Sequence, residues 1–176
     1  MRTRFSLLFF WSWFFLTAQN RQPVHLACKD ANFNQEVKDW LQFTVPVISV
    51  QQLAGQSDQY VILDARETEE FAISHIKGAI LVGYDKFNLN QIPKLGENKR
   101  IVVYCSIGYR SEKIAEKLKK AGYKQVYNLY GGIFEWVNNA FPVFNAQDRA
   151  ETRLHTFNQK WSKWVLNPDV QKVWAK

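Results

Sequence analysis

The chain has 176 residues, and 47% of them are apolar, so it can form one domain with its own hydrophobic core and short terminal segments. Its 23 basic and 16 acidic residues give a formal net charge of +7. The basic residues are not interleaved with aromatic ones, and many mark the solvated face of a helix in SEKIAEKLKK, so we expect no nucleic-acid partner. Two cysteines are too few for a disulfide framework.

The N-terminal residues have the pattern of an export signal. Arg2 and Arg4 precede an almost entirely apolar stretch over residues 5–16, and the small residue Ala18 follows it. This pattern predicts a signal peptide over residues 1–18 and an exported, periplasmic protein whose mature chain is not embedded in a membrane. The stretch is shorter than the ~20 residues that span a bilayer. An uncleaved membrane anchor is the first alternative, and a buried core helix is the second.

Cys28 has no clear role in the sequence. It follows His25, Leu26 and Ala27, which gives a faint likeness to a lipid-attachment site. However, histidine is unsuitable at the third position before the cysteine of such a site. Pairing between Cys28 and Cys105 as a redox switch is another reading, and sequence alone cannot test it. Both roles stay open at this point.

Five short apolar runs predict strands, and helical patterns separate them. Near-continuous apolar strands of this kind are typical of a parallel sheet whose two faces are both covered by helices. We therefore expect an α/β fold with a five-stranded parallel sheet flanked by helices on both faces. The strands are expected at residues 46–48, 60–63, 79–82, 101–104 and 126–129.

Apolar spacing and capping residues predict the helices. Ser49 can cap a brief helix that ends near Leu53, and Ser111 can cap the clearest helix, which ends at Ala121 before Gly122. Apolar residues recur at helical spacing in a short helix that precedes the main domain. The other helices are expected over residues 33–41, over 67–73, and around Phe134 after the turn at Gly131 and Gly132.

The C-terminal residues predict one more helix. Leu154, Phe157, Trp161, Trp164 and Val165 fall on one side of a helix that the Asn-Pro pair at 167–168 would end. We expect this stripe to pack against its own domain, with partner docking as the alternative. The expected organisation is a signal peptide (1–18), a linker with a short helix (19–42), the main domain (43–144) and a helical extension (145–176).

Cys105 lies where an open parallel sheet binds ligands, at the carboxyl end of a strand and just before a helix. The loop from Cys105 to Arg110 can aim several backbone N–H groups inward, and Gly108 allows a tight turn. The following helix adds the positive end of its dipole, and Arg110 adds a full charge. Together these groups stabilise a thiolate without a general base, which accounts for the lack of a histidine nearby in sequence.

Around this loop the chain resembles the rhodanese-like sulfurtransferases, over roughly residues 43–143. The resemblance rests on the order and spacing of several motifs, each of which would be weak alone. The fold of that family is a five-stranded parallel sheet flanked by helices, in agreement with the elements above. The motifs are LDAR at 63–66 with EF at 70–71, SHIKGAI at 74–80, CSIGYRS at 105–111 and LYGGIFEW at 129–136.

The resemblance implies that Cys105 attacks the outer sulfur of a donor, thiosulfate or a persulfide, and carries that sulfur as a persulfide. A thiophilic acceptor, cyanide or a thiol, then removes it. The implied partners are these small molecules, with a protein persulfide as a further donor, and no metal or organic cofactor is implied. The residues implied to bind substrate are Ser106, Ile107, Gly108, Tyr109, Arg110, Ser111, Asp64 and Arg66.

Other readings of the same residues stay open. The spacing Cys-x4-Arg makes a smaller cradle than the Cys-x5-Arg loop of related phosphatases, so phosphatase activity is a weaker alternative. A catalytically idle binding module is the non-enzymatic alternative, and the presence of both Cys105 and Arg110 argues against it. Asp64 and Arg66 either contact substrate or form a simple ion pair that holds a strand end.

The identity of the sulfur donor is also open. Ile107 and Tyr109 stand in a loop where several thiosulfate-using relatives carry an additional basic residue. The more apolar rim suits a protein-bound persulfide, a thiol such as glutathione or an organic polysulfide at least as well as free thiosulfate.

Overall fold

The computed structural model describes residues 26–92, 95–96 and 98–174. The expected signal peptide and His25 lie outside the described residues. Within these ranges, no helix combines the length and the apolar composition that crossing a membrane requires.

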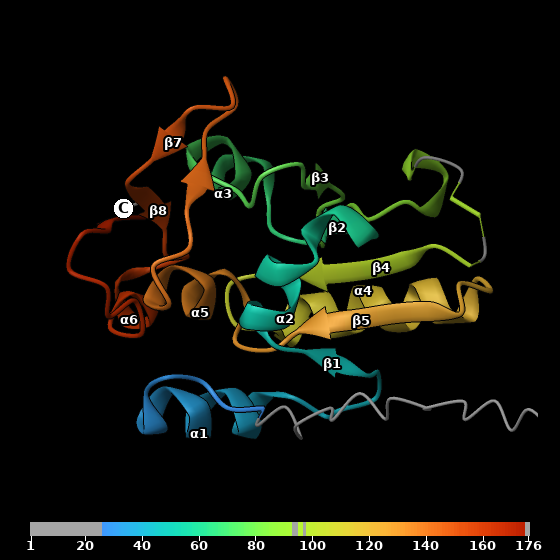
Figure 1. Cartoon of the computed structure of the whole chain (residues 1–176), viewed down its shortest axis with the longest axis horizontal. Coiled ribbons are helices and arrows are strands. Elements are labelled where there is room, and N and C mark those ends of the chain that lie inside the picture. Colours follow the sequence, from blue (N-terminus) through green and yellow to red (C-terminus); the bar gives the residue numbers. More distant parts are fainter. Residues whose placement is uncertain (1–25, 93–94, 97, 175–176) are drawn as a thin grey trace, which may run out of the picture.

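Five parallel strands form the central sheet in the order β1-β5-β4-β2-β3, which confirms the predicted fold class (Figure 1). In the register of the sheet, Asp64 lies opposite Tyr104, and Ile101 lies opposite Val126. All five carboxyl ends therefore lie at one end of the sheet. The strands are β1 (Val47–Ile48), β2 (Tyr60–Asp64), β3 (Ile80–Leu81), β4 (Arg100–Tyr104) and β5 (Gln125–Leu129).

Helices cover both faces of this sheet, as expected. The α-helices of the N-terminal and central parts are α1 (Ala31–Trp40), α2 (Val50–Gly55), α3 (Thr68–Ile73), α4 (Tyr109–Lys120) and α5 (Gly132–Asn138). The single-turn 3-10 helices are η1 (Ser57–Gln59) and η2 (Leu89–Gln91).

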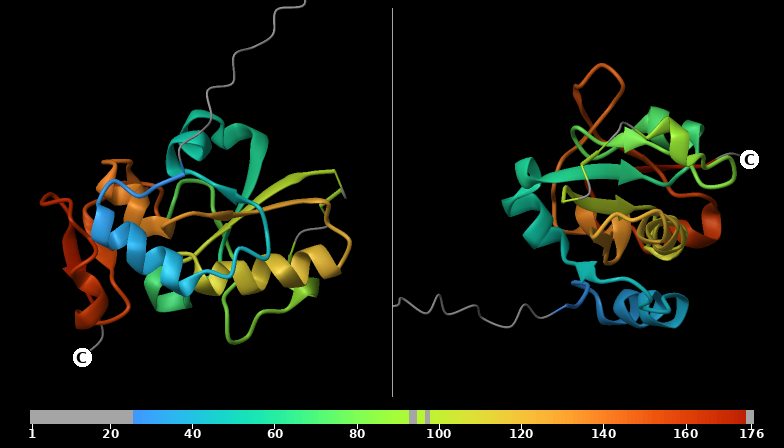
Figure 2. Two further views of the ribbon diagram at one scale, coloured as in Figure 1. Left: turned by 90° about the horizontal axis from the view of Figure 1, so that it is seen from below. Right: turned by 90° about the vertical axis from the view of Figure 1, so that its right-hand side faces the viewer.

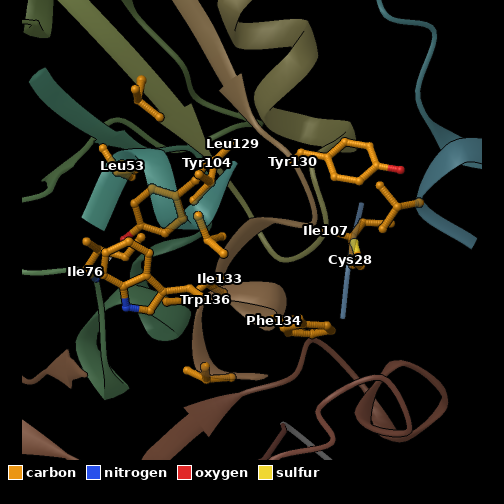
Figure 3. Packing of buried hydrophobic residues seen from close by; sticks show 14 of the residues in the cluster. Cys28, Leu53, Ile76, Tyr104, Ile107, Leu129, Tyr130, Ile133, Phe134 and Trp136 are labelled. Atoms are coloured by element: carbon orange, nitrogen blue, oxygen red, sulfur yellow. Dashed lines mark hydrogen bonds between the residues drawn. The ribbon is translucent and has the colours of Figure 1, made fainter. Parts of the chain in front are cut away.

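Side chains alternate between the two faces of the sheet, and each face has its own core. On one face, Leu63 and Val103 pack in a cluster with Ile114 of α4. On the other face, Ile62 and Val102 pack in a cluster with residues of α2 and α5. This second cluster also contains Cys28, Ile107, Tyr130 and Phe134 (Figure 3).

The N-terminal helix α1 lies along the β1 edge of the sheet (Figures 1 and 2). Asp30 caps it, because its Oδ1 accepts the Phe33 N–H at 2.8 Å. Phe33 and Val37 are completely buried in the cluster that α2 and α5 share. The last residue of the helix, Trp40, is 42% exposed and lies beside the first turn of α4. Thus α1 belongs to the packed body of the domain.

The two predicted N-caps have different outcomes. Ser49 caps α2 in a capping box with Gln52, with hydrogen bonds of 3.2 and 3.0 Å. Ser111 is not an N-cap, because α4 begins two residues before it, after Gly108, whose φ is 120°. The Gly108 carbonyl already accepts the Glu112 N–H at 3.0 Å, and this bond starts the helix earlier than the sequence indicates.

The expectation of a single C-terminal helix is wrong. Leu154 is buried in a strand, Phe157 adopts a positive φ of 63°, and Asn158 then caps a short helix by accepting the Trp161 N–H at 3.1 Å. The apolar stripe is therefore divided among a strand, a turn and a helix. The elements are β6 (Val143–Phe144), β7 (Ala150–Glu151), β8 (Arg153–His155), α6 (Gln159–Ser162) and β9 (Gln171–Val173).

The C-terminal segment folds back over the sheet at the carboxyl ends of its strands. β6 pairs with β7 in antiparallel orientation, and β8 pairs with β9 in parallel orientation. Figure 1 shows α6 and β8 at the end of the sheet toward which the arrowheads of β4 and β5 point. Leu154 and Val165 are completely buried, so this part of the stripe packs against its own domain, as expected.

Candidate active site

Cys105 follows β4 directly and is one of the residues that line a cavity of about 240 Å³. The residue is 1% exposed, and its Sγ accepts the Gly108 N–H at 3.2 Å. The sulfur therefore faces the backbone loop that follows it, where a main-chain donor can stabilise negative charge. The sequence predicts several inward-facing backbone N–H groups around the cysteine, and the Gly108 N–H is one such donor.

Two glycines allow the loop to close around the sulfur. Gly108 has a φ of 120°, and a Cβ at this position would lie 3.2 Å from Leu41 Cδ2. A Cβ on Gly132 would lie 2.4 Å from the carbonyl oxygen of Cys105 and 2.6 Å from that of Ser106. Backbone from the start of α5 therefore packs directly against the loop.

The N-terminal turn of α5 also binds the loop carbonyls. The Ile133 N–H donates to the Cys105 carbonyl at 2.9 Å, and the Phe134 N–H donates to the Ser106 carbonyl at 3.1 Å. These hydrogen bonds satisfy two carbonyls of the loop and fix it against the start of α5. The Gly-Gly turn at 131–132, which the sequence indicates as a strand-to-helix turn, thus shapes the cysteine loop.

Arg110 binds Glu70 of α3 at two points. Its Nη1 donates to Glu70 Oε2 at 2.6 Å, its Nη2 donates to Oε1 at 2.8 Å, and Nη2 also lies 3.1 Å from Ser106 Oγ. Both partners are largely buried. Arg110 is therefore half of an ion pair, which corrects the expectation that it gives the loop a full positive charge.

The pair is ionised on both sides. Burial works against the charged form of Arg110, but its hydrogen bonds to Glu70 and the nearby Cys105 outweigh burial and hold its pKa above the ordinary value. Burial also raises the pKa of Glu70, but the hydrogen bonds and charge of Arg110 outweigh this effect and leave it below the ordinary value. Glu70 belongs to a motif that the sequence analysis noted, yet its role in the site was not predicted.

Asp64 and Arg66 form a second, fully buried ion pair. Arg66 Nη2 donates to Asp64 Oδ2 at 2.7 Å and to the Ser74 carbonyl at 2.7 Å. The Asp64 carboxylate also accepts the backbone N–H of Arg66 at 2.9 Å. Neither side chain is among the described residues that line the cavity. The geometry favours the simple ion pair over a substrate contact.

Ser111 connects the loop to β5. Its Oγ lies 2.7 Å from Asn128 Oδ1 and 3.1 Å from the Gly108 carbonyl, which also accepts a hydrogen bond from Asn128 Nδ2 at 3.0 Å. Both residues are completely buried. Ser111 therefore anchors the turn at Gly108, and its partner Asn128 was not predicted from the sequence.

Half of the described residues that line the cavity are aromatic. Ile107 and Tyr109 line it as predicted, together with Ser106 and Arg110. The remaining wall residues were not predicted as site residues and come from α1 and the C-terminal segment. They are Trp40, Phe157 and Trp161.

Cys28 lies apart from this cavity lining. It is buried in the second core cluster, and both it and Cys105 are free thiols. Burial, followed by the nearby Glu135 carboxylate, raises the pKa of the Cys28 thiol well above its ordinary value.

Among the described residues, no group of three or more His, Cys, Asp and Glu side chains could hold a metal ion.

The chain is similar in sequence and in fold to known proteins. A rhodanese-related protein of known structure from Thermoplasma volcanium is 28% identical with a TM-score of 0.50, over 56% of this chain and 97% of that one. The tRNA uridine(34) hydroxylase of Streptococcus thermophilus is 34% identical over 122 residues, which are 64% of this chain and 36% of the relative. The corresponding protein of Streptococcus pyogenes is 32% identical over 142 residues, covering 69% and 42%. The chain thus spans less than half the length of these curated relatives.

The family model for the rhodanese-like domain matches residues 49–139. This region contains Cys105, Arg110 and Glu70, whereas Trp40 and the C-terminal wall of the cavity lie outside it. The match covers more than half of the chain and includes the complete cysteine loop. The chain therefore belongs to the rhodanese-like domain family.

Proposed function

We propose that the protein moves a sulfane sulfur from a donor to a thiophilic acceptor through a persulfide on Cys105. The observation that carries this proposal is the position of Cys105, whose Sγ accepts the Gly108 N–H at 3.2 Å and which is one of the residues that line the cavity. At this position a thiolate has a main-chain donor and access to a small molecule. Membership in the rhodanese-like family supports the same chemistry.

The reaction has two halves, sulfur transfer from the donor to Cys105 and then from Cys105 to the acceptor, and the Sγ of Cys105 takes part in both. With thiosulfate as donor, the Cys105 thiolate attacks the outer sulfur, the S–S bond of the donor breaks, and sulfite leaves with the electron pair. With cyanide as acceptor, the carbon attacks the outer sulfur of the persulfide anion, thiocyanate forms, and Cys105 leaves as a thiolate. The negative charge lies on Sγ in the thiolate, where the Gly108 N–H can stabilise it, and on the outer sulfur in the persulfide anion.

A steady-state assay tests this proposal. The donor is thiosulfate or glutathione persulfide, the acceptor is cyanide, and thiocyanate is measured. Replacing the attacking sulfur in Cys105→Ser is expected to lower turnover by about three orders of magnitude or more. Cys28→Ala is the matched control and retains turnover. Equal turnover by the wild type and Cys105→Ser contradicts the proposal, and no turnover by the wild type with any donor favours an idle binding module.

The curated relatives support a second candidate, the modification of a uridine in tRNA. The observation in its favour is the 34% identity with a protein named tRNA uridine(34) hydroxylase, of which this chain spans 36%. Incubation of the protein with an unmodified tRNA transcript and with dissolved dioxygen as the oxidant, followed by mass analysis of the nucleosides, tests this candidate. An oxygen added to uridine only when Cys105 is present would favour it over sulfur transfer.

We also propose that the protein is exported to the periplasm. The support is the pattern of Arg2 and Arg4 before the apolar stretch at 5–16. The intact mass of the protein from its native cells tests the proposal. A chain that starts near Gln19 is the expected result, and a full-length species at the membrane would favour the uncleaved anchor instead.

A further inference from the structure

Three aromatic residues of the cavity come from outside the region that the family model matches. Trp40 ends α1, and Phe157 and Trp161 belong to the C-terminal segment, whereas the match covers residues 49–139. The ring of Trp40 lies 5.6 Å from that of Trp161 and 5.5 Å from that of Tyr109, in edge-to-face geometry. Two segments that are distant in sequence therefore build one aromatic wall beside Cys105.

The charge in the cavity is already balanced. Among the described residues that line it, Arg110 is the cationic one, and both of its terminal nitrogens bind Glu70, at 2.6 and 2.8 Å. The Phe157 ring lies 5.4 Å from the centre of this guanidinium group. A dianion such as thiosulfate would lose its hydration here without gaining an unpaired cation, and it would face electron-rich aromatic rings.

The cavity has the size of an aromatic ring with a short substituent. An apolar cavity of roughly 150 Å³ binds benzene, so the present volume of about 240 Å³ can hold a ring and the two sulfurs attached to it. Trp40 and Trp161 present faces and edges at which such a ring can stack or meet edge to face. Size and lining both suit an apolar group next to the attacking sulfur.

We infer that the sulfur donor is an organic persulfide, R–S–SH, whose R is an uncharged aromatic or compact apolar group held between Trp40, Phe157 and Trp161. This inference rests on the proposed function and names its donor. The Cys105 thiolate attacks the outer sulfur and forms a new S–S bond, while the S–S bond of the donor breaks. R–S⁻ leaves with the electron pair, and the hydrogen stays on the transferred sulfur as Cys–S–SH.

Two donors that differ by one charged group test the inference. Benzyl persulfide and 4-carboxybenzyl persulfide share a ring and a reacting sulfur, and the second adds a carboxylate that the aromatic wall cannot pair. The rate at which the protein gains one sulfur on Cys105 gives kcat/KM for each donor. We expect benzyl persulfide to exceed both 4-carboxybenzyl persulfide and thiosulfate by at least about tenfold, because an unpaired charge is costly to desolvate. Equal values for the three donors overturn the inference.

Variants of the wall test where the selectivity arises. Phe157 is 51% exposed, so Phe157→Ala is expected to fold, and Trp161→Ala is the second variant. Each should lower the ratio of the benzyl to the thiosulfate value by about tenfold, because benzyl persulfide loses a ring–ring contact that thiosulfate never makes. Trp174→Ala is the matched control, since Trp174 is 36% exposed in the same segment and does not line the cavity.

The outcomes separate this inference from the proposed function. Sulfur gained on Cys105 from all donors, with a ratio that the wall variants leave unchanged, overturns the inference and leaves sulfur transfer intact. No sulfur gained on Cys105 from any donor overturns the proposed function itself. A ratio that falls equally in Trp174→Ala also overturns the inference, because the effect would not depend on the wall.

Discussion

Glu70 of α3 and Arg110 of α4 are joined by two hydrogen bonds of 2.6 and 2.8 Å across the start of the cysteine loop. Ser106, inside the loop, contacts both partners, at 3.4 Å from Glu70 Oε1 and 3.1 Å from Arg110 Nη2. The pair thus holds two helices and the loop in one arrangement. The two side chains neutralise each other, and the hydrogen-bond donor to Cys105 Sγ is the backbone N–H of Gly108.

Removing one side of this pair is expected to destabilise the fold. Glu70→Gln leaves the buried guanidinium of Arg110 without a counter-ion and should lower the free energy of unfolding by about 3 kcal/mol. Urea denaturation measures the change. Glu116→Gln is the control, because Glu116 pairs with Lys113 at a more exposed site and should cost less than about 1 kcal/mol. Equal losses in the two variants would show that the Glu70–Arg110 pair has no special role.

The same pair predicts a pH dependence of stability. The pKa of Glu70 is lower in the folded protein than in the unfolded chain, so folding releases a proton from this carboxyl at acid pH. Its stabilising contribution is complete above the unfolded value of about 4.3 and is lost as the pH falls through the folded value. The wild type should therefore lose stability below about pH 4 more steeply than Glu70→Gln. Parallel curves for the two proteins would contradict this assignment.

Gly132 should not tolerate a side chain. A Cβ there would lie 2.4 Å from the Cys105 carbonyl oxygen, and the residue has a positive φ of 56°, so Gly132→Ala must displace the cysteine loop. We expect a large loss of sulfur transfer, accompanied by a lower melting temperature. Gly55→Ala is the control, because a Cβ there meets nothing within 4 Å. Full activity in Gly132→Ala would mean that the loop does not need this close approach.

The two cysteines should react differently in the folded protein. Burial and the Glu135 carboxylate raise the pKa of Cys28, so this thiol is expected to resist iodoacetamide, whereas Cys105 is one of the residues that line the cavity. Peptide mapping after alkylation at neutral pH should find the label on Cys105, and on both residues only after unfolding. Preferential labelling of Cys28 in the folded state would contradict the assignment of the reactive thiol.

The sequence predicted the sheet and the position of Cys105 for local reasons. The strands are short apolar runs between helical patterns, and the register that follows puts Asp64, Tyr104 and Leu129 near one end of the sheet. A residue directly after a central strand of such a sheet lies at its carboxyl edge, so the location of Cys105 follows from β4 alone.

The side chains that hydrogen-bond to residues of the cysteine loop could not be predicted from local sequence patterns. Glu70 and Arg110 are 40 positions apart, and Asn128 and Ser111 are 17 apart, so only the folded chain brings each pair together. The aromatic wall combines α1 with the C-terminal segment, whose apolar spacing suggests one helix. The positive φ of Phe157 and the cap at Asn158 interrupt that helix, and neither can be read from periodicity.

The central claim is that Cys105 carries a sulfur atom. The most direct measurement is the mass of the Cys105 peptide, taken after the protein has been treated with benzyl persulfide or thiosulfate and freed of excess donor, and again after cyanide is added. We expect a gain of one sulfur on Cys105 that cyanide removes as thiocyanate. An unchanged mass at Cys105 with every donor, or a stable adduct that cyanide does not release, would contradict it.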